Sequence, residues 1–111
     1  MEVEQRSLKV VRCESDLANA RVARAKEELA EKESQFATGE ITKDELESIK
    51  TALAQLTEAA QVATAKRERA ELEAAEANLR RQQKLLKLGI AGKDDVDRAQ
   101  EKLAELKAPK N

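Results

Sequence analysis

Two copies of a signal that ends one helix and starts the next lie fifty positions apart in this sequence. The first copy is Gly39-Glu40-Ile41-Thr42-Lys43-Asp44-Glu45-Leu46, and the second is Gly89-Ile90-Ala91-Gly92-Lys93-Asp94-Asp95-Val96. Glycine ends a helix in the left-handed conformation without a Cβ penalty, and the acidic residues that follow favour a new helix N-terminus. The two signals predict an all-α chain with three helices, over about 3–37, 43–88 and 93–108.

Each signal also contains specific capping residues. Thr42 is a strong N-cap, and Glu45 three positions later completes the pattern of a capping box. Ile41 and Leu46 have the spacing of the hydrophobic staple that accompanies such a box. We therefore expect a sharply defined turn between the first two helices.

The second turn follows the same pattern with weaker capping. Gly89 is expected to end the helix, with Leu85 touching Ile90 in the apolar contact of a Schellman motif. Gly92 takes the N-cap position that Thr42 holds in the first turn, and Asp95 is the expected capping acid.

Apolar residues recur at steps of three and four along the first two predicted helices, which is a heptad pattern. The stripe on helix 3–37 is Leu8, Val11, Ser15, Ala18, Val22, Ala25, Leu29, Lys32 and Phe36. The stripe on helix 43–88 is Leu46, Ile49, Leu53, Leu56, Ala60, Ala63, Arg67, Ala70, Ala74 and Ala77. Folding the second helix back on the first pairs Phe36 with Leu46, and every later layer keeps this register. The pattern predicts an antiparallel coiled-coil hairpin with helix 43–88 as a long central helix.

The third helix has its own apolar stripe, formed by Val96, Ala99, Leu103 and Leu106. It matches a second stripe on helix 43–88 through the layers Val96–Leu86, Leu103–Leu79 and Leu106–Ala75. Pro109 is expected to end this helix. A third set of positions, Val3, Val10 and Leu17, is spaced by seven beside the main stripe and either covers the helix junction or faces another chain. The repeated offset of fifty favours an internal duplication.

The composition agrees with packed helices and excludes several other classes of protein. Charged residues make up 39% of the 111 residues and aromatic residues 1%, which is typical of coiled coils and suits one elongated domain over 1–111. A net charge of −1 argues against nucleic-acid binding and against an anionic-membrane footprint. No apolar run is long enough to span or insert into a membrane.

The residues of catalysis and metal binding are missing from the sequence. There is no histidine and a single cysteine, so the usual general base and a conventional zinc site are excluded. Asp94 and Asp95 are interpreted as first-turn acids that stabilise a helix N-terminus. We predict no enzyme activity, no catalytic residue, no metal and no cofactor. Cys13 lies off the stripe, and an exposed incidental thiol is favoured over an intermolecular bridge.

Residues 81–99, Arg81-Gln82-Gln83-Lys84-Leu85-Leu86-Lys87-Leu88-Gly89-Ile90-Ala91-Gly92-Lys93-Asp94-Asp95-Val96-Asp97-Arg98-Ala99, resemble the hairpin tip of periplasmic adaptor (membrane fusion) proteins. Those proteins serve tripartite efflux pumps and type I secretion systems. The family tip has an arginine, a leucine four residues on and a serine seven further; Arg81 and Leu85 match the first two, and Gly92 stands in the place of the serine. The first turn, over 36–42, is similar to a turn of outer-membrane efflux channels.

The resemblance implies that the second turn docks onto the helical end of an outer-membrane channel. Arg81 is then expected to donate hydrogen bonds to partner carboxylates or carbonyls, with Leu85 and Ile90 as apolar anchors. Gly92 and Lys93 complete the expected partner-binding set. The resemblance also implies a periplasmic location and a chain that is the hairpin part of a longer exported protein.

The alternative is a stand-alone coiled-coil scaffold that self-associates into a homo-oligomer through alanine-rich helix faces, with no role in transport. Its location would be cytoplasmic, because Met1-Glu2-Val3-Glu4-Gln5-Arg6 does not resemble a signal peptide. Both hypotheses are non-enzymatic and differ in the surface that binds.

Overall fold

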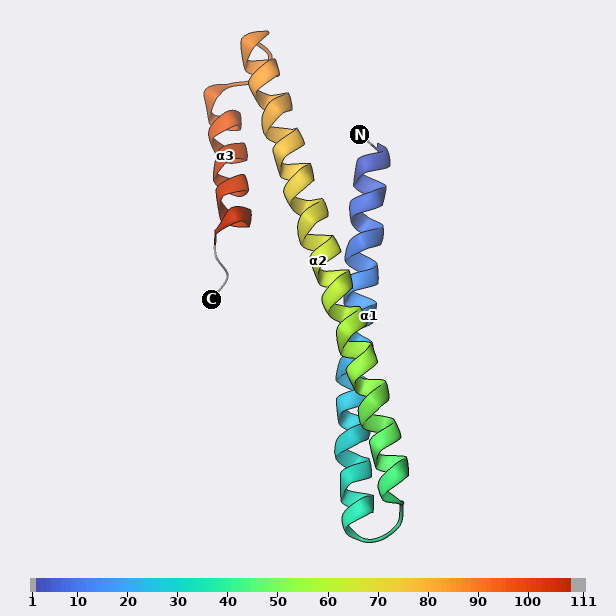
Figure 1. The fold of residues 1–111 in the computed structure, drawn as a ribbon. Helices are drawn as coiled ribbons and strands as arrows, with labels where there is room; N and C mark the ends of the chain where they lie inside the picture. Colours follow the sequence, from blue (N-terminus) through green and yellow to red (C-terminus); the bar gives the residue numbers. More distant parts are fainter. Residues whose placement is uncertain (1, 109–111) are drawn as a thin grey trace. The chain divides into compact units, whose positions relative to one another are not determined.

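The computed structural model describes residues 2–108, and side chains from residue 6 onward. It contains α1 (Glu2–Ala37), α2 (Lys43–Lys87) and α3 (Lys93–Lys107), labelled in Figure 1. No strand occurs within residues 2–108. The predicted all-α class and its three helices are confirmed, and each helix end lies within one residue of its expected position. Pro109 and the side chain of Val3 lie outside the described part.

The chain gathers into two compact units. One is Val10–Ala65, which contains the first turn. The other is Lys66–Asn111, which contains the second turn, together with Met1–Lys9. The single elongated domain expected over 1–111 stays a prediction.

Burial in the unit Val10–Ala65 follows the apolar stripes that the sequence predicts. On α1, every stripe position from Val11 to Lys32 is buried or half-buried, and the residues between them are exposed. On α2, Leu46 is 6% exposed and Ala60 is 5% exposed. Leu29 of α1 lines the same surface groove as Leu53 and Ala54 of α2, so the two helices lie beside each other within this unit.

The second unit is also organised by the predicted stripe of α3. Val96 and Ala99 are buried, with 7% and 5% of their surface exposed, and Leu103 and Leu106 are half-buried. On α2, Ala75 is 7% exposed. Small residues at such positions allow a neighbouring helix to approach closely, which suits a chain with few large side chains.

Two positions depart from the predicted layers, and both lie in the last turn before a helix ends. Phe36 is 42% exposed and Leu86 is 39% exposed, whereas the preceding residues, Gln35 and Leu85, are half-buried. About two-fifths of the surface of Phe36 and of Leu86 therefore stays uncovered at the layers Phe36–Leu46 and Val96–Leu86 that were expected to close the two ends. Leu46 is nevertheless buried, and the half-buried Ile41 stands at the staple position that can cover it.

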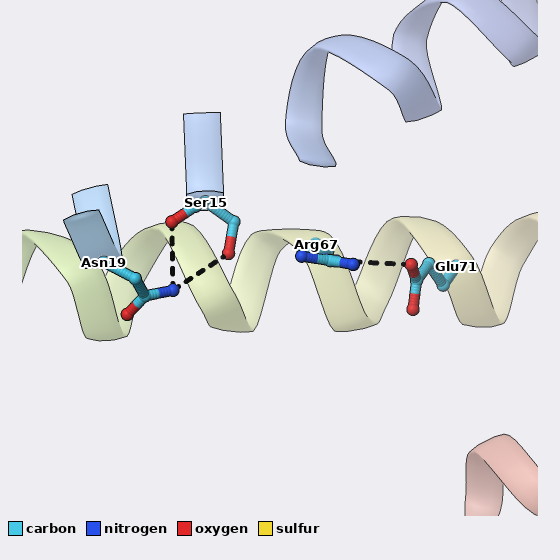
Figure 2. A network of polar contacts seen from close by, with 4 residues as sticks. All are labelled: Ser15, Asn19, Arg67 and Glu71. Atoms are coloured by element: carbon cyan, nitrogen blue, oxygen red, sulfur yellow. Dashed lines mark hydrogen bonds and ion pairs between the residues drawn. The ribbon is translucent and has the colours of Figure 1, made fainter. Parts of the chain in front are cut away.

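Two polar residues within the stripes, Ser15 and Arg67, bond to neighbours on their own helices. Ser15 is 1% exposed, and the side-chain amide of Asn19 donates to its carbonyl at 2.9 Å and to its hydroxyl at 3.5 Å (Figure 2). In the other unit, Arg67 Nε donates to Glu71 Oε1 at 3.3 Å (Figure 2). Such local pairs let a polar side chain occupy a stripe without an unsatisfied donor.

Candidate functional site

The second turn has the hydrogen bonds of a Schellman motif. The Gly89 amide donates to the Leu86 carbonyl at 3.0 Å, and the Ile90 amide donates to the Leu85 carbonyl at 2.9 Å. Gly89 has a φ of 75°, in the left-handed region that this motif requires. The carbonyls of Leu85 and Leu86 are thereby satisfied, and the backbone of the turn is fixed.

The first turn has the same geometry fifty residues earlier. The Gly39 amide donates to the Phe36 carbonyl at 3.0 Å, and the Glu40 amide donates to the Gln35 carbonyl at 2.8 Å. The φ of Gly39 is 80°. The left-handed helix ends predicted at both glycines are confirmed, and the two turns form a matched pair within one chain.

The two turns start their next helices with complementary halves of a capping box. In the first turn the Glu45 amide donates to Thr42 Oγ1 at 3.1 Å. In the second turn the Gly92 amide donates to Asp95 Oδ2 at 3.1 Å, as expected for a capping acid. Gly92 has no side chain to return the bond, so the start of α3 has one side-chain cap contact where a full box has two.

The side chains that the turns expose are very different. Leu86, Leu88 and Ile90 are 39%, 64% and 73% exposed, and we call these three residues the apolar tip. The corresponding residues of the first turn are Phe36, Thr38 and Glu40, of which the last two are polar. Because the backbones match, the apolar tip is a property of the second turn's sequence and is not required by the fold. Exposed large apolar side chains that follow one another along a turn are candidates for an interaction site.

The residues expected to bind a partner fall into two groups. Ile90, Gly92 and Lys93 are exposed, as a docking site requires. Arg81 and Leu85 are half-buried, and Arg81 already interacts within the chain. The exposure of Ile90 also means that its predicted contact with Leu85 leaves most of its side chain uncovered.

Leu88 is the residue that the sequence reasoning missed. The heptad count assigned Leu86 to a layer and left Leu88 without a role, although it is one of the most exposed large apolar residues described. The sequence does contain a signal for this exposure. Leu88 directly precedes Gly89, so it lies after the last stripe position at which α2 can pack against another helix.

Two hollows are described on the surface, one in each unit. A largely open groove of about 640 Å³ in the unit Val10–Ala65 is lined by Leu29, Lys50, Leu53, Ala54, Thr57, Glu58 and Gln61. A smaller pocket of about 280 Å³ in the other unit is lined by Glu68, Glu71, Leu106 and Ala108. Among the side chains described, those of residues 6–108, no three of His, Cys, Asp or Glu are placed to hold a metal ion.

No protein-family model, curated protein or solved structure matches this chain. The resemblance to adaptor hairpins therefore depends on the residues of the second turn alone. Among the described helices, none has the length and apolar character needed to cross a membrane.

Proposed function

We propose that this chain is a non-enzymatic helical interaction module whose second turn docks onto a protein partner. The observation that carries the proposal is the apolar tip, which exposes Leu88 and Ile90 on a backbone fixed by the Gly89 cap. A fixed backbone lowers the entropy lost on binding, so apolar side chains held this way make efficient anchors. The partner suggested by the resemblance is the helical end of an outer-membrane channel, and the setting would then be periplasmic.

The proposal includes an antiparallel coiled-coil hairpin as the support for the turns. The buried stripes on α1 and α2 support this arrangement, as does the groove that Leu29 and Leu53 line together. Those two residues belong to one predicted layer. In this arrangement the helices act as a stiff support, and the turns present the binding residues.

Arg81 and Leu85 have supporting roles in this site. They are one helical turn apart, so they share a face of α2 just before the apolar tip. Because Arg81 is already engaged within the chain, docking would exchange its present interactions for carboxylates or carbonyls of the partner. A guanidinium group suits such exchange because its donors form a planar fork. Lys93 and Gly92 are exposed on the far side of the turn and complete the contact surface.

The test uses the first turn as the template for a disabling variant. Leu88→Thr with Ile90→Glu gives the second turn the residues of the first, on a backbone that already accommodates them. Binding to a detergent-solubilised efflux-type outer-membrane channel is measured by surface plasmon resonance. We expect at least about tenfold weaker binding, because each lost apolar contact is worth about 1.5 kcal/mol or more.

The matched control changes the corresponding positions of the first turn, Thr38→Ala with Glu40→Ala, and should bind like the wild type. Arg81→Ala is a second variant that should also weaken binding, with helicity unchanged by circular dichroism. Equal affinity of the wild type and the Leu88→Thr, Ile90→Glu variant would rule out the apolar tip as the docking site.

The scaffold alternative is favoured by a separate observation. Val10, Leu17 and Val62, all in the unit Val10–Ala65, are 53%, 52% and 65% exposed. Exposed apolar residues along helix faces suit lateral packing against a second copy. Replacing Leu17 and Val62 with glutamate should then dissociate the oligomer in sedimentation experiments, whereas the apolar-tip variant should not.

A further inference from the structure

The two turns carry opposite net charge. Residues 27–50 contain eight acidic and three basic residues, and residues 77–100, the same window fifty positions later, contain six basic and three acidic residues. The acidic set is Glu27, Glu28, Glu31, Glu33, Glu40, Asp44, Glu45 and Glu47. The basic set is Arg80, Arg81, Lys84, Lys87, Lys93 and Arg98. The overall net charge of −1 conceals this division.

Most of these charges are exposed at the surface, although Arg98 also forms an ion pair with Asp95 at 2.6 Å. Every member of the acidic set is exposed, and every member of the basic set except Arg81 is exposed. The helix ends add to the difference. The last turn of α1 has no basic residue to offset its carbonyl end, whereas the last turn of α2 has Lys84 and Lys87.

Both turns expose apolar side chains beside their charged residues. The basic turn exposes Leu88 and Ile90, and the acidic turn exposes Phe36 at 42% of its surface. An interface of this type combines an apolar centre with a charged rim of opposite sign on the two partners. Both turns therefore expose apolar surface, and each has a net charge opposite to that of the other.

We infer that the second turn of one copy docks onto the first turn of another copy, so that this chain associates head to tail. The inference rests on the proposed docking role of the apolar tip and names a second copy of the chain as a partner for it. Each copy uses one turn of each kind, so the contact is heterologous and extends into an open chain or closes into a ring. The contact is small and charge-dependent, so the association is weak and weakens further with salt.

Two charge-reversal variants test the inference. Lys84→Glu, Lys87→Glu and Lys93→Glu make the second turn acidic, and this combination is the second-turn variant. Glu31→Lys, Glu33→Lys, Glu40→Lys and Glu47→Lys make the first turn basic, and this combination is the first-turn variant. All seven side chains are exposed, so the helices should be retained, which circular dichroism verifies.

Sedimentation equilibrium gives the average mass as a function of protein and salt concentration. The wild type should increase in mass with concentration at about 50 mM salt and approach the monomer at about 500 mM, where charges are screened over a few ångströms. Each variant alone should stay monomeric, because its two turns have the same sign. An equal mixture of the two variants should associate at least into pairs, because the unchanged second turn of one variant meets the unchanged first turn of the other. Arg21→Glu with Arg24→Glu, exposed positions on α1 outside the window, is the control and should still associate.

Three results would overturn the inference. The first is a wild type that stays monomeric at low salt and millimolar concentration, and the second is a mixture whose mass does not exceed that of its components. The third is binding of the wild type to anionic phospholipid vesicles, lost in the second-turn variant, without any self-association. None of these results decides the proposed function, which is judged by channel binding of the Leu88→Thr, Ile90→Glu variant.

Discussion

Gly39 and Gly89, fifty residues apart, have φ values of 80° and 75° and make the same pair of backbone hydrogen bonds at 2.8–3.0 Å. Each amide donates to the carbonyl three residues before it, and the amide that follows donates five residues back. The offset of fifty that favours an internal duplication in the sequence therefore holds for the backbone as well. The second turn adds a hydrogen bond from the Ala91 amide to the Leu85 carbonyl at 3.2 Å. The differences in exposed apolar surface and in charge lie in the side chains, which makes each turn a control for the other.

Replacing either glycine should destabilise the chain through backbone strain alone. A Cβ added at Gly39 or Gly89 would meet no atom within 4 Å, so no steric contact contributes. The left-handed conformation costs an ordinary residue about 1–2 kcal/mol, and we expect Gly39→Ala and Gly89→Ala each to lose that much free energy of unfolding in urea titrations. Gly39→Asn should lose less, because asparagine enters this region more readily.

The control for this series is Gly92, which has a φ of −90° that any residue adopts. Gly92→Ala should therefore lower the free energy of unfolding by less than Gly39→Ala or Gly89→Ala does. Equal stabilities for the wild type and Gly39→Ala would show that the left-handed turn is not maintained in solution.

Substitutions at the two N-caps should change the free energy of unfolding in opposite directions. Thr42→Ala removes the hydroxyl that accepts the Glu45 amide and should cost about 1 kcal/mol. Gly92→Thr supplies the missing hydroxyl and should gain several tenths of a kcal/mol, since Gly92 has an extended backbone that threonine accepts.

Thr51→Ala is the matched control for the caps. Its hydroxyl donates to the Glu47 carbonyl within α2 at 3.0 Å and caps nothing. This substitution should be neutral or slightly stabilising, because alanine has the higher helix propensity. Losses of the same size for Thr42→Ala and Thr51→Ala would contradict a capping role for Thr42.

A third prediction concerns how burial near the helix ends affects the free energy of unfolding. Leu46 is 6% exposed and Phe36 is 42% exposed, although both belong to the predicted closing layer. We expect Leu46→Ala to cost about 2 kcal/mol or more and Phe36→Ala to cost under about 1 kcal/mol, measured by urea unfolding. The reverse order would restore the layer that the sequence predicts.

The same comparison shows what could be read from the sequence. Stripes such as Val11 to Lys32, the three helices and the glycine-ended turns were all predictable, because heptad spacing and capping depend on neighbours within a few residues. The last turn was not predictable by counting. The count of threes and fours continues to Phe36 and Leu86, but α1 and α2 end one residue later, and beyond those ends Ile41 and Ala91 are the half-buried positions.

The candidate site was predicted only in part for a related reason. Ile90 and Lys93 were expected as surface residues from the resemblance and are exposed, whereas Arg81 is partly covered and already engaged. Exposure at a turn depends on which carbonyls the capping amides bond and on where the facing helix lies. The spacing of apolar residues predicts neither. Leu88 was missed because heptad counting has no position for an apolar residue that faces solvent.

The proposed hairpin can be measured directly within the unit Val10–Ala65. Spin labels at Ala20→Cys and Val62→Cys, in a Cys13→Ser background, occupy exposed positions that the antiparallel register places near each other. Packed helix axes are about 8–10 Å apart, so we expect a label separation under about 25 Å by electron paramagnetic resonance. An uninterrupted straight helix between the same positions would give roughly 60 Å, and such a value would exclude the hairpin.

The hydrogen bonds that fix the first turn join residues no more than five positions apart. A segment that holds its own shape in this way is portable, and grafting residues 34–46 between two unrelated helical sequences should transplant the bend with it. A gene that copies such a block gains another bend without having to evolve new long-range contacts first. Helical proteins can therefore grow by whole modules, and later substitutions at a few exposed sites are enough to give two copies of one bend different binding surfaces.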